Sequence, residues 1–154
     1  MILLAYMDVV AETVDQTHSV AADLLESLQP QDNQATVVGF SGPLGAGKTE
    51  FIRGLLRSAG IESAVTSPTY TIETVYKLPK TSFDHAYHVD AYRLEDGSDL
   101  QDIGFENRLT DPKNLVLVEW ADSVAGKLSE KTISVDISIK DDKRVIAIKH
   151  EQGE

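Results

Sequence analysis

The sequence has no cysteine among its 154 residues. This absence excludes a disulfide scaffold, a thiolate zinc site and thiol-based catalysis, and it is compatible with a reducing compartment. Glycine and proline are not enriched, with 10 and 5 residues, which argues against collagenous, low-complexity or long disordered segments. The apolar opening over residues 1–7 is too short to span a bilayer and lacks an export signal's basic flank and cleavage site. We therefore expect a cytoplasmic protein with no membrane segment.

Positively charged side chains are few. The chain carries 25 acidic residues against 14 lysines and arginines, a formal net charge of −11. This sign opposes direct binding to the phosphates of a nucleic acid or to an anionic membrane. If the protein acts on nucleotides or nucleic acid, a local site or another protein must overcome the repulsion.

The sequence is otherwise that of an ordinary globular protein, with 42% apolar and 25% charged residues. A chain of this length fits one domain and can bury about two thirds of its unfolded surface, so it needs no structural metal. We expect a single domain over residues 1–154.

Hydrophobic periodicity predicts alternating helices and strands. A helical face predicts a first helix that ends before Pro30; its residues are Val14, Thr17, Ala21, Leu24, Leu25 and Leu28. A β-branched run over residues 36–40 predicts a buried strand, and a helical pattern after it closes at Gly60. The later predictions are extended segments over 65–76, 85–93 and 114–120, a helix over 98–109, and a hairpin of 132–139 and 144–149 around Asp141 and Asp142. This order favours a three-layer α/β domain, with a mainly parallel sheet and antiparallel edge strands.

One motif carries most of the chemistry. Residues 42–49, Gly-Pro-Leu-Gly-Ala-Gly-Lys-Thr, match the phosphate-binding pattern of P-loop proteins and lie between a predicted strand and a predicted helix. Small residues let backbone amides turn toward phosphate oxygens, and the helix N-terminus adds positive potential. Lys48 supplies a point charge, and the hydroxyl of Thr49 can bind magnesium.

Two acidic residues are candidates to face this loop. Asp90 and Glu119 both lie near the ends of extended runs, where a doubly wound sheet forms its ligand crevice. A carboxylate there binds a metal ion or orients an attacking water, and the sequence does not separate these roles. The structural alternative is that each carboxylate caps a helix or pairs with an arginine.

Two further residues, Trp120 and Thr69, have a structural role by default. Trp120, the only tryptophan, is by default a packing residue. Thr69, within Ser67-Pro68-Thr69, is by default a turn residue, but its hydroxyl also fits a position near a γ-phosphate, as in the switch segments of phosphate-sensing proteins.

Four motifs in order resemble the bacterial TsaE (YjeE) family. They are the glycine-rich run 42–49, Ser-Pro-Thr-Tyr-Thr at 67–71, His-Val-Asp-Ala-Tyr-Arg-Leu at 88–94 and Glu-Trp at 119–120. The resemblance extends from about residue 36 to residue 128, with a looser match around Glu12 and Thr13. It implies a small P-loop NTPase-like domain with weak, partner-dependent ATP hydrolysis. That activity assists the synthesis of threonylcarbamoyladenosine, the modified base beside the anticodon of some tRNAs.

The resemblance also implies cofactors, partners and site residues. The cofactors are ATP and Mg²⁺, and the partners are TsaB and TsaD, the latter transferring a threonylcarbamoyl group made by a TsaC-type enzyme. Asp90 and Glu119 are the implied catalytic residues, and Thr49 and Glu119 the implied metal pair. The implied nucleotide-binding residues are Thr13, Gly42, Leu44, Gly45, Ala46, Gly47, Lys48, Thr49, Glu50, Thr69 and Trp120. Because of the net charge, we expect no direct binding of tRNA.

Other P-loop classes remain as alternatives. A small-molecule kinase needs an acceptor pocket and several arginines around the transferred phosphoryl group, whereas two of the five arginines here, Arg53 and Arg57, belong to the helix after the loop. A GTPase is disfavoured because no Asn-Lys-x-Asp run is present. A third alternative is a module that senses ATP and regulates a partner without useful turnover. It differs from the accessory ATPase that the resemblance implies only in the rate of ATP hydrolysis.

Overall fold

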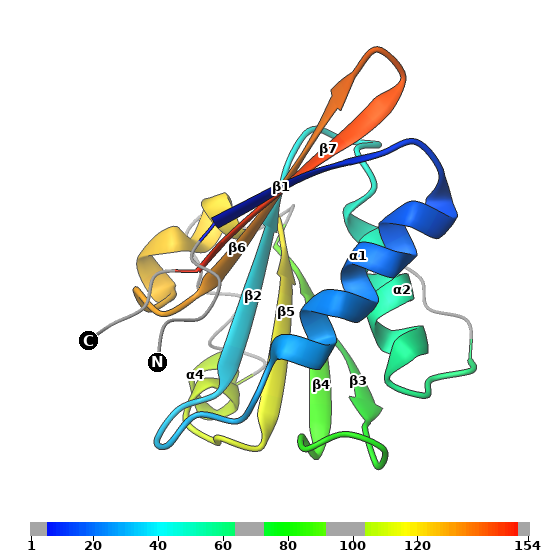
Figure 1. Ribbon diagram of the computed structural model, residues 1–154. Coiled ribbons are helices and arrows are strands. Elements are labelled where there is room, and N and C mark those ends of the chain that lie inside the picture. Colours follow the sequence, from blue (N-terminus) through cyan, green and yellow to red (C-terminus); the bar gives the residue numbers. More distant parts are fainter. Residues whose placement is uncertain (1–5, 64–72, 92–103, 151–154) are drawn as a thin grey trace.

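The structure is a computed structural model that describes residues 6–63, 73–91 and 104–150. Figure 1 shows its helices and strands along the chain. In order they are β1 (Tyr6–Ala11), α1 (Val14–Ser27), β2 (Thr36–Ser41), α2 (Lys48–Ser58), β3 (Glu73–Lys77), β4 (His85–Asp90), α4 (Phe105–Leu109), β5 (Asn114–Glu119), the 3₁₀ segment η1 (Ala121–Lys127), β6 (Ile133–Lys140) and β7 (Lys143–His150). None of the helices in these ranges is long and apolar enough to cross a membrane.

The described strands form one seven-stranded sheet in the order β1-β7-β6-β2-β5-β4-β3. Its centre is parallel, since β2 pairs in parallel with both β5 and β6, and β4 pairs in parallel with β5. The outer pairs are antiparallel: β7 with β6 and with β1, and β3 with β4. Every residue of β5 is buried, as is typical of a parallel strand covered on both faces. The predicted mainly parallel sheet with antiparallel edges is confirmed.

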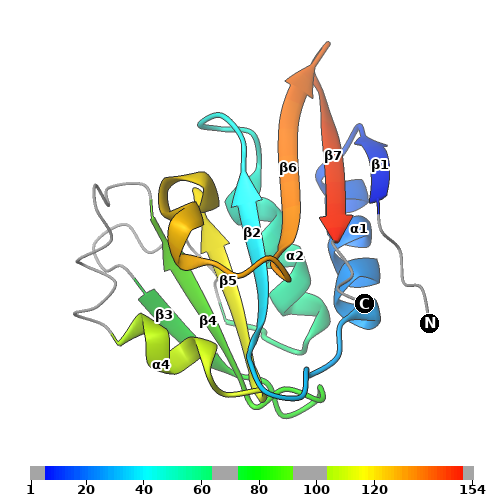
Figure 2. The ribbon, with the colours of Figure 1, turned by 90° about the vertical axis from the view of Figure 1, so that its left-hand side faces the viewer.

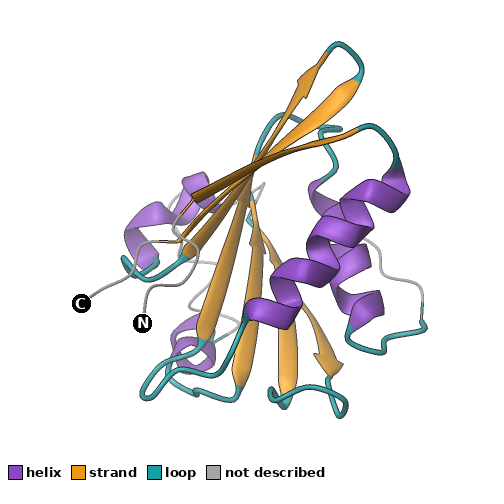
Figure 3. Ribbon diagram, viewed as in Figure 1, coloured by secondary structure: helices purple, strands orange, loops and turns teal. Residues whose placement is uncertain are grey.

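Helices cover both faces of this sheet and make three layers. Helices α1 and α2 lie on one face, and α4 and η1 lie on the other (Figures 1, 2 and 3). Side chains alternate between the two layers along β2: Val38 belongs to the apolar cluster that includes α1 and α2, whereas Val37 belongs to the cluster with Phe105 and Val124. This alternation follows from the two-residue period of a strand.

Most predicted elements are found, with different ends. The first helix begins after Thr13 and is capped by Leu28, two residues before Pro30; Val14, predicted on its buried face, is 52% exposed. Of the predicted helix over 98–109, the described part is the short α4, because residues 98–103 lie outside the described ranges.

The extended segments are also shorter than predicted within the described ranges. The prediction over 65–76 is met by β3, and residues 64–72 lie outside the description. The prediction over 85–93 is met by β4, which ends at Asp90. Strand β1 was not predicted: only its first two residues belong to the apolar opening over residues 1–7, and residues 8–11 were assigned to no element.

The C-terminal hairpin is confirmed. Strands β6 and β7 are joined by Asp141 and Asp142, whose φ angles are 52° and 65°. Two consecutive residues with positive φ are typical of the two-residue turn that matches the twist of a hairpin, and Asp tolerates this conformation better than most residues. The hairpin extends beyond β2 at the upper end of the sheet (Figure 2).

Helices α1 and α2 approach closely at Gly54. A Cβ atom at this position would lie 2.7 Å from Cδ2 and 2.8 Å from Cα of His18. We expect Gly54→Ala to lower the thermal midpoint by several degrees, because a backbone clash costs about 1–3 kcal/mol and exceeds the helix propensity gained. Circular dichroism melting would measure this. Gly126→Ala is the control, since nothing lies within 4 Å of its Cβ position, and equal melting of the two variants would contradict the prediction.

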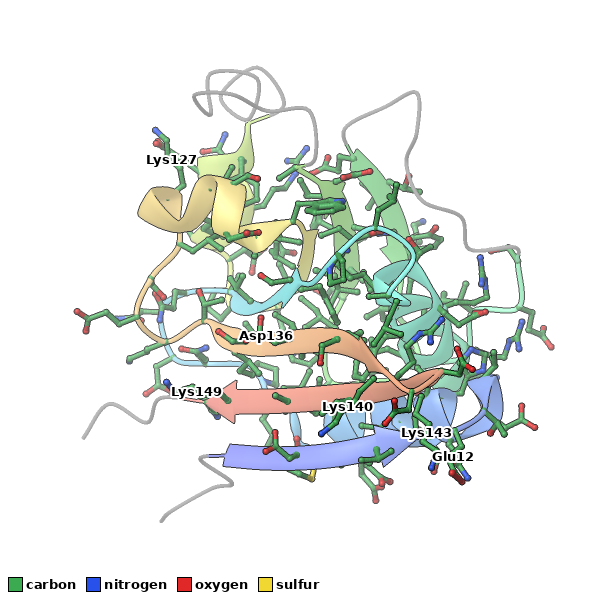
Figure 4. All side chains as sticks on the ribbon, turned by 90° about the horizontal axis from the view of Figure 1, so that it is seen from above. Glu12, Lys127, Asp136, Lys140, Lys143 and Lys149 are labelled. Carbon is green, nitrogen blue, oxygen red and sulfur yellow. The ribbon has the colours of Figure 1, made fainter. Side chains whose placement is uncertain are left out.

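Asp136 on β6 is an electrostatic weak point beside β7, which carries Lys149 (Figure 4). Partial desolvation raises the pKa of Asp136, the Asp122 carboxylate raises it further, and Lys149 lowers it. A raised native pKa means that the ionised carboxylate destabilises the fold as the pH rises through that pKa.

We therefore expect Asp136→Asn to raise the thermal midpoint by about 1 °C at pH 7, in keeping with a gain of at most about 0.5 kcal/mol at an exposed site. The gain should vanish in acid, where the carboxyl group is protonated in both states. Melting curves at several pH values would check this. Asp32→Asn, also at an exposed position, controls for the general relief of negative charge, and an equal gain in it would contradict the prediction.

Candidate nucleotide-binding site

The glycine-rich loop joins two central elements. It leaves β2 after Ser41 and enters α2 at Lys48, so it lies at the carboxyl end of a parallel strand, where ligands bind in open α/β sheets. Gly42 has a φ of 143°, and a Cβ there would lie 2.1 Å from the carbonyl oxygen of Ile137. Gly47 caps α2 with a φ of 111°. The predicted strand, loop and helix are confirmed, and glycine is required at both positions.

Lys48 folds back over the loop. The side chain is buried, and its Nζ donates to the carbonyl oxygens of Gly42 at 2.7 Å and Pro43 at 3.0 Å. Burial lowers the pKa of Lys48, and the negative charges of Glu119, Asp122 and Asp90 partly oppose this. An ammonium group is thus held at the loop by carbonyl oxygens that phosphate oxygens can replace as partners.

Trp120 lies beside this lysine. Its ring centroid is 3.8 Å from Lys48 Nζ, within cation–π range. The ring also packs against the apolar cluster that contains Val118 and Val124, which confirms the packing role of Trp120, and its role in nucleotide binding stays a prediction. Its φ of 61° is unusual for a bulky residue, and this conformation occurs where the chain turns from β5 into η1.

Thr49 and Glu119 meet across the loop. The hydroxyl of Thr49 donates to Glu119 Oε1 at 2.9 Å and to Oε2 at 3.1 Å. Glu119 is only 3% exposed and ends β5. The predicted magnesium pair is therefore in contact.

The donor set of this pair fits Mg²⁺. The part of the chain that the structure describes contains no cluster of three or more His, Cys, Asp or Glu residues able to hold a metal. A cation here would therefore take few ligands from the protein. Mg²⁺ is commonly bound in this way, by one or two protein oxygens together with waters and substrate phosphates.

Asp90 lies level with Glu119. The two residues end neighbouring parallel strands and are Cα partners in the register of β4 and β5. The backbone N–H of Ala91 donates to the carbonyl oxygen of Glu119 at 3.0 Å and fixes this alignment. The structure thus brings both predicted catalytic carboxylates to the same edge of the sheet as the glycine-rich loop.

Thr13 lies beside the glycine-rich loop in space, although it is far from residues 42–49 in the sequence. It caps α1, and its side chain accepts from the backbone N–H of Gln16 at 3.1 Å. A cavity of about 340 Å³ places Thr13 with Gly45, Ala46, Gly47 and Glu50. Asp142 and Arg144 from the hairpin line the same cavity. They are absent from the predicted site because no local motif marks them.

Glu50 and Leu44 differ in their surroundings. Glu50 contacts Arg53 and accepts from His18 Nε2 at 3.2 Å. Burial raises the pKa of Glu50, but the hydrogen bonds and charges of Arg53 and His18 outweigh it, so the pKa is lowered overall. Leu44 is 78% exposed at the loop tip. Thr69 lies outside the described residues, so its predicted role stays a prediction.

His88 is a site residue that sequence reasoning missed. The imidazole is fully buried, and its Nε2 lies 2.6 Å from Glu119 Oε2. Its position two residues before Asp90 was the available signal, because alternate residues of a strand share a face.

The parallel centre of the sheet, the glycine-rich loop after β2 and the Thr49–Glu119 pair together define a P-loop NTPase-like domain. Solved structures agree on this fold. The crystal structure of Bacillus subtilis YdiB superposes with a TM-score of 0.71 at 22% identity, over 97% of this chain and 88% of that chain.

Sequence comparison identifies the family. The family model described as "Threonylcarbamoyl adenosine biosynthesis protein TsaE" matches residues 11–146. The tRNA threonylcarbamoyladenosine biosynthesis protein TsaE of Rickettsia typhi is 33% identical over 88% of this chain and 90% of its own length. The protein of the same name from Haemophilus influenzae is 35% identical over 82% of this chain and 77% of its own length. The chain belongs to the TsaE family, whose members are named for tRNA threonylcarbamoyladenosine biosynthesis.

Proposed function

We propose that this protein binds Mg²⁺ and ATP and hydrolyses ATP weakly, as an accessory factor that acts on a complex of TsaB and TsaD during threonylcarbamoyladenosine synthesis. The observation that carries the proposal is the constellation of Lys48, Thr49 and Glu119 around the glycine-rich loop. Family membership supports the pathway, since the relatives are named for it.

The proposed roles follow from where each group lies. Lys48 and the amides of residues 45–47 bind the phosphates, because they combine positive charge with donors at a helix N-terminus. Thr49 and Glu119 hold the cation, which when bound neutralises charge on the β- and γ-phosphates. Asp90, at the next strand end, orients the attacking water and accepts its proton. The products are ADP and inorganic phosphate.

The partner requirement is supported by charge. With a net charge of −11, the chain repels tRNA, and the positive potential of this site is local: it comes from Lys48, the loop amides and the cation, with Arg144 in the neighbouring cavity. The link to tRNA is therefore expected to pass through TsaB and TsaD. Detectable binding of tRNA to the isolated chain at physiological salt would contradict this division.

The test of the pathway is cellular. The protein is depleted from its host, and tRNA nucleosides are quantified by mass spectrometry after complementation with the wild type, Lys48→Ala or Lys77→Ala. Threonylcarbamoyladenosine should fall on depletion and recover with the wild type and Lys77→Ala but not with Lys48→Ala. Lys77 is a suitable control because it is exposed and pairs with His85 at the opposite end of β4. An undiminished level of the modified base on depletion would refute the proposal.

A further inference from the structure

Glu119 is held from two sides by different kinds of element. Thr49 contacts it from the first turn of α2, and His88 contacts it from β4 inside the sheet. A carboxylate has about four lone-pair positions, so both contacts leave room for a cation. The two partners are not equivalent, because Thr49 is itself a proposed cation ligand whereas His88 is not.

The chemistry of the pair defines the direction of the hydrogen bond. The ionised carboxylate of Glu119 only accepts, so His88 Nε2 carries the proton and donates across 2.6 Å. The other ring nitrogen, Nδ1, is buried and has no hydrogen-bond partner among the described residues. This tautomer leaves Nδ1 as an acceptor and avoids a buried N–H without a partner, which would be costly.

Burying an imidazole beside a buried carboxylate costs free energy of desolvation, which a side chain that only filled space would not need. Apolar side chains surround this part of the sheet, including Leu117, the register partner of His88. An apolar residue would pack at position 88 without the cost of desolvating a polar ring. The hydrogen bond to Glu119 therefore explains why a polar ring is buried at position 88.

We propose that His88 is a positioning residue that holds the Glu119 carboxylate in the orientation that binds the cation. This inference rests on the proposed function, because it concerns the same cation site. Thr49 is itself a proposed ligand of the cation, so its contact with Glu119 is not independent of the cation. His88, anchored on a strand paired on both sides, supplies the fixed contact. Outer contacts of this kind typically change metal affinity by about 10–100-fold.

The test compares two amide variants of equal polarity. In His88→Gln, the amide nitrogen reaches the place of Nε2 and can donate to Glu119. In His88→Asn, the shorter side chain places its nitrogen near the position of Nδ1, and the hydrogen bond is lost. Both replace a buried polar ring with a buried amide, so a general packing effect should be similar in the two.

Two affinities are measured for each variant. The affinity for ADP in excess EDTA, followed by calorimetry, reports the phosphate site without metal. The affinity of the ADP-bound protein for Mn²⁺, a spectroscopic substitute for Mg²⁺, is measured by electron paramagnetic resonance. We expect His88→Asn to bind Mn²⁺ about 10–100-fold more weakly, with ADP affinity in EDTA changed less than about twofold. His88→Gln should recover most of the Mn²⁺ affinity.

Equal Mn²⁺ affinity in the two variants, whether high or low, would overturn the positioning role. Parallel loss of both affinities in His88→Asn would also overturn it, since this is the sign of a structural role. Failure of the proposed function is recognised separately, because the wild-type protein itself would then bind neither ADP nor Mn²⁺.

Discussion

Replacement of Lys48 by alanine is expected to weaken the binding of ATP and ADP by at least about 100-fold. The ammonium group contacts the glycine-rich loop directly, through the carbonyl oxygens of Gly42 and Pro43. Charge-assisted hydrogen bonds to phosphate contribute about 1.5–3 kcal/mol each, and a bound nucleotide offers several acceptor oxygens. Titration calorimetry with ATP and ADP would measure the loss.

The same substitution should leave the fold intact. Burial lowers the pKa of Lys48 because the ammonium group loses part of its hydration at the loop. Removing it therefore relieves a desolvation penalty, and we expect the thermal midpoint to stay the same or rise slightly. Lys77→Ala removes an equal charge from an exposed position at the other end of the sheet and should bind nucleotide like the wild type. Unchanged nucleotide affinity in Lys48→Ala would show that the site is wrongly assigned.

Replacement of Glu119 by glutamine is expected to lower Mg²⁺-dependent ATP hydrolysis by about 100-fold or more. Glutamine retains the shape of the side chain. Its single amide oxygen, in the place of Oε2, can accept from His88 at 2.6 Å and from Thr49 at 3.1 Å, whereas the amide nitrogen takes the place of Oε1 and can donate to the Thr49 hydroxyl. What is lost is the negative charge that a hard cation requires. The affinity for ADP in EDTA should therefore change little, and the loss should appear in turnover and in cation binding.

Phosphate release measured over a range of Mg²⁺ concentrations would check this. Glu106→Gln on α4 is the matched control, because Glu106 is exposed and α4 lies near the opposite end of the sheet from the glycine-rich loop (Figures 1 and 2). If Glu119→Gln and the wild type turned over equally at every Mg²⁺ concentration, neither a metal-binding nor a catalytic role for Glu119 could stand.

The two substitutions probe separable steps. Lys48 acts on the phosphates whether or not a cation is present, whereas Glu119 acts through the cation. Their different effects in EDTA thus distinguish the proposed phosphate site from the proposed metal site at the glycine-rich loop. Asp90 is placed to complete the set, level with Glu119 on the neighbouring strand.

The glycine-rich loop was predictable because its information is local. The signal lies in consecutive residues, between a β-branched run and a helical pattern, and each of these forms as expected. The C-terminal hairpin was predictable for the same reason, since alternating apolar residues on either side of Asp141 and Asp142 specify both strands and the turn. Such features depend on neighbours in the chain.

Strand β1 could not be predicted from its own residues. Tyr6–Ala11 has no strong alternation, and it becomes a strand by pairing with β7 at the other end of the chain. An edge strand of this kind is defined by the partner that supplies its hydrogen bonds. Its pairing in turn positions Thr13, which caps α1 and lines the cavity beside Gly45 and Gly47.

The sequence alone specified the acidic balance, the phosphate-binding loop, the α/β class and the two candidate carboxylates, because composition and local pattern encode these directly. Tertiary structure decided which groups meet: Thr49 and His88 at Glu119, Lys48 over Trp120, and Thr13 with Arg144 around one cavity. The order of strands in the sheet sets these contacts. Residues far apart in the chain become neighbours only when β4, β5 and β2 align their carboxyl ends at one edge.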